Sequence, residues 1–71
     1  MTIGERYAIE KVKDKLIEAK YYVEVQDNKI RVFHKFKFIT FVVTNGLISD
    51  RIDINNTNEV INYIQYRLMN I

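Results

Sequence analysis

The chain has 71 residues, no Cys and a formal net charge of +2, from 11 Lys and Arg against 9 Asp and Glu. This length supports one small core, so we expect a single domain over residues 1–71. The lack of Cys excludes a disulfide framework or a thiolate metal site and is typical of a reducing compartment. The small net charge does not by itself indicate a polyanionic partner.

The N-terminal segment has the pattern of an amphipathic helix. Thr2 and Glu5 have the spacing of a capping box, in which each side chain satisfies a backbone donor at the helix start. From Glu5 to about Lys20, apolar residues recur at steps of three and four and predict one buried face. Charges interrupt the whole segment, so it is neither a secretory signal nor a membrane span. We therefore expect a cytoplasmic protein without a membrane partner. The predicted buried face comprises Ala8, Ile9, Val12, Leu16, Ile17 and Ala19.

Three segments after this helix have the composition of strands. Residues 21–25 (YYVEV) alternate between the two faces of a strand. The longest candidate is 29–45 (KIRVFHKFKFITFVVTN), which is rich in β-branched and aromatic residues and lies between the turn signals Asp27-Asn28 and Asn45-Gly46. Residues 47–54 alternate again, but Asp50 interrupts their apolar face, which predicts a strand end or a local irregularity there. Together the segments predict an antiparallel sheet of three or four strands.

The apolar positions of the central stretch change parity along its length. Pairing outward from the first turn places even-numbered residues such as Ile30 toward the core, whereas pairing from the second turn places odd-numbered residues such as Ile39 there. A regular strand cannot present both sets on one face, so regular pairing must break near His34–Phe36. A β-bulge or a turn at His34-Lys35 would do this. Because Gly, Asn and Asp are absent nearby, we favour a bulged or kinked strand.

The C-terminal segment predicts a second helix. Asn56 and Glu59 have capping-box spacing, and apolar residues between Thr57 and Asn70 recur at helical intervals. The whole chain therefore predicts an α+β fold in which an N-terminal and a C-terminal helix flank the antiparallel sheet in sequence and cover one of its faces. The apolar stripe of this helix comprises Val60, Ile61, Ile64, Leu68 and Ile71.

Catalytic chemistry lacks the residue combinations that it needs. His34 is the one His, and the chain has no Cys beside it, no paired carboxylates at mechanistic spacing and no glycine-rich phosphate loop. One His without a second His or Cys is also a poor metal site. We therefore expect no enzyme activity, no cofactor and no metal.

Basic and aromatic residues coincide in the central stretch. Four basic residues lie between Asn28 and Ser49 without an acidic residue among them, and basic plus aromatic side chains on a sheet suit phosphate contacts and base stacking. The alternative explanation, which involves no ligand, is that strand lysines discourage edge-to-edge aggregation. The candidate nucleic-acid surface is Lys29, Arg31, Phe33, Lys35 and Lys37.

Aromatic residues exceed what one sheet face and two helix stripes can bury. Exposed aromatic rings on a small domain indicate a protein interface, although single exposed aromatics are also ordinary. A two-fold homodimer is the commonest way to form such an interface. The candidate interface residues are Tyr22, Phe33, Phe36, Phe38, Tyr63 and Tyr66.

The chain is Pro-free as well as Cys-free and is rich in Ile, Lys, Asn, Tyr and Phe, as residues 52–64 (IDINNTNEVINYI) show. In size, layout and composition it resembles small prophage proteins of low-GC Gram-positive bacteria, in particular the Yopt family of Bacillus prophages. The resemblance implies a homodimer and no known activity. We expect a non-enzymatic, homodimeric interaction protein with an unidentified protein partner, a prophage accessory or host-modulating factor. The alternative is a small nucleic-acid-binding protein or regulator.

Overall fold

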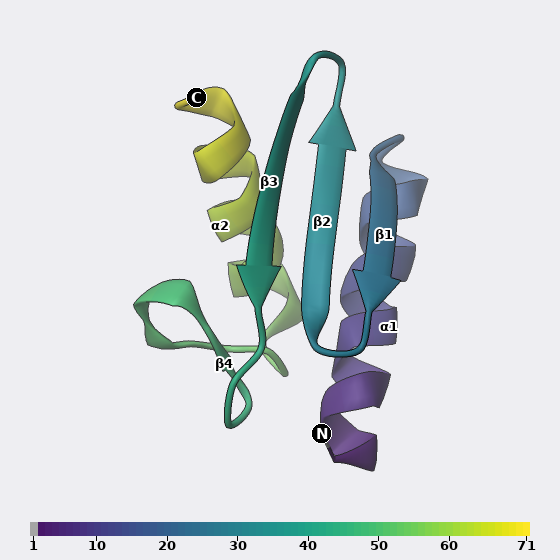
Figure 1. Cartoon of the computed structure of the whole chain (residues 1–71), viewed down its shortest axis with the longest axis vertical. Helices are drawn as coiled ribbons and strands as arrows, with labels where there is room; N and C mark the ends of the chain where they lie inside the picture. The colour runs from purple at the N-terminus through teal and green to yellow at the C-terminus, as the bar shows by residue number, and fades with distance from the viewer. Residues whose placement is uncertain (1) are drawn as a thin grey trace.

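The structure is a computed structural model that describes residues 2–71, without the side chain of Asp50. It has an α+β fold, as the sequence predicts, with one helix before and one after the strands (Figure 1). The elements in chain order are α1 (Ile3–Glu18), β1 (Tyr22–Gln26), β2 (Lys29–His34), β3 (Lys37–Val42), β4 (Leu47–Ile48), the 3-10 helix η1 (Ser49–Arg51), β5 (Ile52–Asp53) and α2 (Thr57–Met69).

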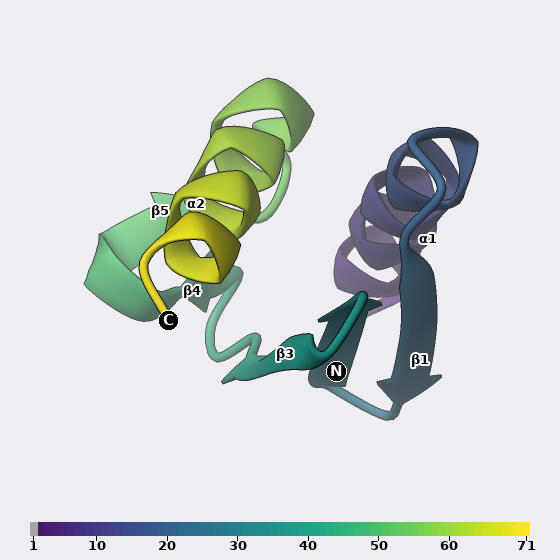
Figure 2. The same ribbon diagram turned by 90° about the horizontal axis from the view of Figure 1, so that it is seen from above.

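The main sheet is a three-stranded antiparallel meander with the order β1-β2-β3. Two-residue turns connect its strands, because Gln26 pairs with Lys29 and His34 pairs with Lys37. Both helices lie on the same side of this sheet (Figure 2), and within residues 2–71 the opposite face carries no other element. The predicted cover of one sheet face by the two helices is therefore confirmed.

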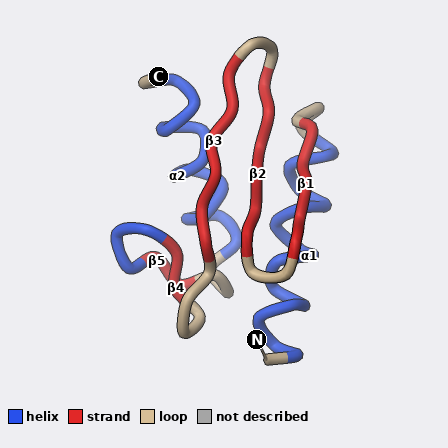
Figure 3. Tube along the Cα trace, in the orientation of Figure 1, coloured by secondary structure: helices blue, strands red, loops and turns tan. Residues whose placement is uncertain are grey.

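The break in the central stretch lies where the parity of the apolar residues predicts it, but it is a turn. β2 ends at His34, and β3 begins at Lys37 (Figure 3). The preference for a bulged or kinked strand is therefore wrong. A two-residue loop pairs even-numbered with odd-numbered positions, and Val32 accordingly pairs with Ile39. Lys35 takes the left-handed conformation that the turn needs, with φ of 58°, although Gly or Asn accepts it more readily.

Residues 47–54 do not form one strand beside β3. Asn45 and Gly46 form a tight turn with φ of 53° and 77°, as predicted. In the described chain, however, the residues on either side of this turn pair only through one isolated bridge, between Thr44 and Leu47. β4 then turns through η1 and pairs with β5. The irregularity predicted at Asp50 is therefore present, and it folds the segment back on itself because Arg51 is left-handed.

Both helices begin with the predicted caps. The hydroxyl of Thr2 accepts a hydrogen bond from the Glu5 backbone, which completes the capping box of α1. The amide oxygen of Asn56 accepts a hydrogen bond from the Glu59 backbone at the start of α2. α1 begins at Ile3 and ends at Glu18, slightly earlier than predicted at each end, and Ile17 is exposed instead of buried.

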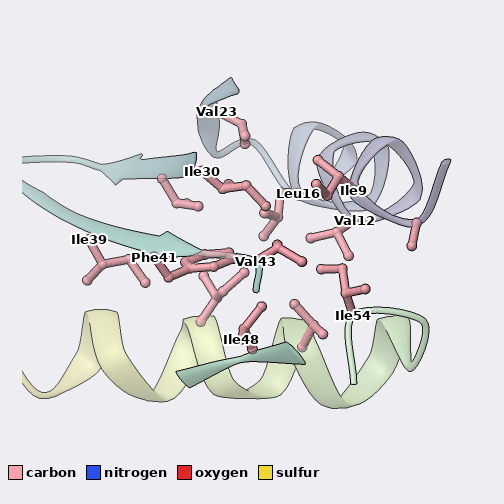
Figure 4. Packing of buried hydrophobic residues seen from close by; sticks show 14 of the residues in the cluster. Ile9, Val12, Leu16, Val23, Ile30, Ile39, Phe41, Val43, Ile48 and Ile54 are labelled. Atoms are coloured by element: carbon pink, nitrogen blue, oxygen red, sulfur yellow. The ribbon is translucent and has the colours of Figure 1, made fainter. Parts of the chain in front are cut away.

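One apolar core fills the space between the helices and the sheet (Figure 4). Among the residues whose side chains are described, no polar or charged side chain is buried. Within residues 2–71, no helix has both the length and the apolar character needed to cross a membrane. The core comprises Ala8, Ile9, Val12, Leu16, Val23, Ile30, Val32, Ile39, Phe41, Val43, Ile48, Ile54, Val60, Ile64 and Leu68.

Candidate functional site

The sheet has an open face, which points away from both helices. Side chains alternate along each strand, so the residues between the core positions of β1, β2 and β3 all point to this face. The register places them in three rows across the sheet. The open face comprises Tyr22, Phe33 and Phe38 in the first row, Glu24, Arg31 and Thr40 in the second, and Gln26, Lys29 and Val42 in the third.

The first of these rows, which we call the aromatic row, contains three rings, of which the central one, Phe33, contacts the other two. The ring of Phe33 lies 5.6 Å from that of Tyr22, edge to face, and 5.6 Å from that of Phe38. Such pairs stabilise by about 0.5–1.5 kcal/mol beyond the area that they bury. Tyr22 remains 64% exposed and Phe38 56% exposed. The row is therefore a fixed apolar surface in contact with water.

Charged side chains border the aromatic row. The guanidinium of Arg31 lies 5.8 Å from the centre of the Phe38 ring, and its Nε donates a hydrogen bond of 3.4 Å to the Thr40 hydroxyl. Glu24 is the cross-strand neighbour of Arg31, so both signs of charge occur in the second row. The open face is therefore apolar at one end and polar in the next row.

The five residues predicted to bind nucleic acid do not share one surface. Lys29, Arg31 and Phe33 lie together on the open face. Lys35 lies in the turn at the hairpin tip. Lys37 has the parity of the core positions of β3, and its Nζ lies 3.5 Å from the backbone oxygen of Leu68 in α2. The tip of the hairpin therefore divides the predicted basic surface.

The six predicted interface residues are also divided. Tyr22, Phe33 and Phe38 form the aromatic row, whereas Phe36 lies fully exposed at the hairpin tip. Tyr63 and Tyr66 belong to α2, on the other side of the molecule. There Tyr63 packs partly against the core and accepts a hydrogen bond of 2.6 Å from Arg67, and Tyr66 is 65% exposed.

A groove that sequence reasoning did not find lies between the hairpin tip and the C-terminal turn of α2. Its volume is about 420 Å³. Its walls come from segments distant in sequence, so no pattern in the sequence predicts it. We call it the tip groove. It is lined by Tyr21, His34, Lys35, Phe36, Lys37, Gln65, Leu68 and Met69.

A second, wider groove runs between the N-terminal half of α1 and the turns at the other end of the sheet. Its volume is about 910 Å³, and its lining mixes Glu5, Glu10 and Asp27 with Arg6 and Lys13. The balanced charges favour no particular ligand. Within the described part of the chain, no three His, Asp or Glu side chains gather as a metal site would require.

Comparison with known proteins adds no relative to this geometry. No family model matches the sequence, and neither the curated proteins nor the solved structures contain a significant match. The resemblance to the prophage family stays a prediction. Functional inference therefore starts from the open face and the two grooves.

Proposed function

We propose that the protein is a non-enzymatic interaction module that forms a homodimer through its open sheet face. The observation that carries this proposal is the aromatic row, which leaves two rings more than half exposed in water. Large apolar side chains gathered on one surface favour a protein contact. A second copy offers the same rigid row, and a two-fold axis near Phe33 would stack the two rows.

The charges on the open face are compatible with self-association. Its charged residues are Lys29, Arg31 and Glu24. Contact between two copies therefore does not bring together large surfaces of like charge. With the axis near the aromatic row, these side chains fall at the rim, where solvent screens them. The apolar rings occupy the centre, where burial stabilises most.

The size of the face sets the expected affinity. Three strands about 4.8 Å apart and five residues of about 3.4 Å each give a patch of roughly 14 by 17 Å. Allowing for side-chain relief, complete overlap of two faces would bury about 1,000 Å² in total, and an axis near one end of the face gives less, which is typical of weak, transient contacts. We therefore expect a weak, reversible dimer, and we take a dissociation constant on the order of 10 µM for the experiments.

Replacement of one exposed tyrosine tests the dimer. Tyr22→Ser removes a ring from the aromatic row and should weaken dimerisation by about tenfold or more. Tyr66→Ser and Tyr7→Ser are matched controls, because these rings are 65% and 67% exposed but lie on the helices. Sedimentation equilibrium between about 5 and 500 µM measures the dissociation constant, and circular dichroism checks the fold. A native protein that stays at 8.5 kDa throughout, or a control that weakens the dimer equally, would refute the proposal.

Binding of single-stranded nucleic acid is the second candidate function. It is supported by the position of Arg31 next to the aromatic row and of Lys29 one row further along the open face. With two phosphate contacts in place of four, the slope of log affinity against log salt should be about −1.4. We would titrate labelled oligonucleotides by anisotropy at low salt. Loss of binding in Lys29→Glu/Arg31→Glu, but not in Lys35→Glu/Lys37→Glu, is the expected pattern. Absence of binding at tens of micromolar protein would remove this candidate.

A further inference from the structure

Two apolar side chains at the border of the tip groove are exposed to water. Phe36 at the hairpin tip is fully exposed, and Met69 in the last turn of α2 is 79% exposed. Between them, the ring of Tyr21 and the side chain of Leu68 line the groove. A molecule with an apolar body would contact all four groups and remove both exposed side chains from water.

The charged side chains that line the tip groove, Lys35 and Lys37, are both basic. His34 and Lys37 are cross-strand neighbours on the helix side of the sheet, and Lys35 follows in the turn. Among the described side chains, no Asp or Glu lines the groove. The wider groove, in contrast, has both signs in its lining. The tip groove therefore favours a negatively charged group beside His34 and Lys37.

Two contacts hold these groups in place. The ring of Tyr21 lies 4.8 Å from the imidazole of His34, centre to centre. The Nζ of Lys37 lies against the backbone oxygen of Leu68, near the carbonyl end of α2. That end of a helix repels an anion, and the positive charge of the Lys37 ammonium at the Leu68 oxygen offsets this repulsion. An anion would bind Lys37 and accept a hydrogen bond from His34.

We propose that the tip groove binds a small amphipathic anion, namely a carboxylate with a short aliphatic or aromatic body. The volume of about 420 Å³ is within the range of small-molecule sites. The carboxylate lies beside His34 and Lys37, and the apolar body lies between Phe36 and Met69. The groove opens on the helix side of the hairpin tip, so this inference does not depend on the proposed dimer.

The test uses the full chain with Tyr22→Ser, in which the proposed dimer is weakened, and follows backbone amide resonances during titration. The probes are 1-naphthoate and octanoate, with 1-naphthalenemethanol as the neutral control and 1-naphthylmethylammonium as the cationic control. We expect saturable shifts around residues 34–37 and at Tyr21, Gln65 and Met69. The dissociation constants of ligands of this size are expected at about 0.1–1 mM. Whichever of the two carboxylates has the lower dissociation constant shows whether the groove prefers an aromatic or an aliphatic apolar part.

Charge and wall variants make the test specific. Lys37→Gln should weaken binding of the carboxylates by about tenfold, whereas Lys13→Gln in the wider groove is the matched control and should change nothing. Phe36→Ser should weaken the naphthoate and leave the fold intact, because Phe36 is exposed. The proposal is overturned if the cationic probe binds as tightly as the carboxylates, if the shifts map to the open face, or if Lys13→Gln has the effect of Lys37→Gln. It is also overturned if the groove resonances move with protein concentration alone, since a second copy would then occupy the groove.

Discussion

Single residues in the left-handed region define the turns of this chain. Asp27, Lys35, Asn45 and Gly46 all have positive φ in turns of two residues. Asn and Gly tolerate this conformation, whereas a Lys in it costs about 1–2 kcal/mol. The turn at Asn45-Gly46 was predictable because its residues have the required conformational preference. The turn at Lys35 was not, because packing of both strands against the helices outweighs the local preference.

The two glycines should respond oppositely to the same substitution. Gly46 has φ of 77° and no heavy atom within 4 Å of an added Cβ, so Gly46→Ala should cost about 1 kcal/mol from backbone strain alone. Gly4 lies in the first turn of α1, and the nearest atom to its added Cβ is the Thr2 hydroxyl at 3.9 Å. Gly4→Ala should therefore raise the free energy of unfolding by about 0.5–1 kcal/mol. Urea unfolding of both variants measures these changes, and effects of the same sign would contradict the interpretation.

At the scale of elements, the even or odd numbering of the core positions predicted the end of β2 better than the residue types in the turn did. The switch from even to odd core positions located the end of β2 correctly, since a loop of two residues requires such a switch. A bulge has the same effect on parity, so the choice between them depended on residue types, and Lys35-Phe36 has none that favour a turn. The pairing of β4 with β5 was harder to predict from the sequence, because it depends on how Ile48 and Ile54 both reach the core.

The hairpin between β2 and β3 should become more stable when its first turn residue suits the turn. Lys35→Asn places a residue that accepts positive φ at a position with φ of 58°, and we expect the free energy of unfolding to rise by about 0.5–1 kcal/mol. Lys29→Asn is the control, because Lys29 lies within a strand and should gain nothing. Thermal and urea unfolding compare the two variants. A loss of stability in Lys35→Asn would show that the turn is not strained.

At the scale of the whole molecule, the candidate site was partly predictable. Alternation along the strands placed Phe33 and Arg31 on one face from sequence alone, and the structure adds Tyr22 and Phe38 beside them. The tip groove was not predictable, because Tyr21 and Met69 come together only when α2 packs over the sheet. Exposure of an aromatic residue also does not reveal which surface it joins, as Tyr66 shows.

Dimerisation through the open face should make the melting temperature depend on protein concentration. With a dissociation constant on the order of 10 µM, raising the concentration from about 5 to about 500 µM stabilises each chain by about 1 kcal/mol. For a domain of this size that corresponds to a rise of roughly 4–8 °C. Calorimetry measures the shift. In the Tyr22→Ser variant a tenfold weaker dimer should reduce the rise by about a third, and an undiminished rise in that variant would speak against the open face as the contact.

The meander also has a consequence for how the chain folds. The residues of its widest strand pair, Lys29 and Val42, are 13 positions apart in sequence, whereas the end of α1 at Glu18 and the start of α2 at Thr57 are 39 positions apart. Closing the longer loop costs about 1 kcal/mol more entropy. Hairpins form in about 1–10 µs, but few strands are stable without a packed face. We therefore expect the three-stranded sheet to form and unfold repeatedly until the two helices pack against it and stabilise it.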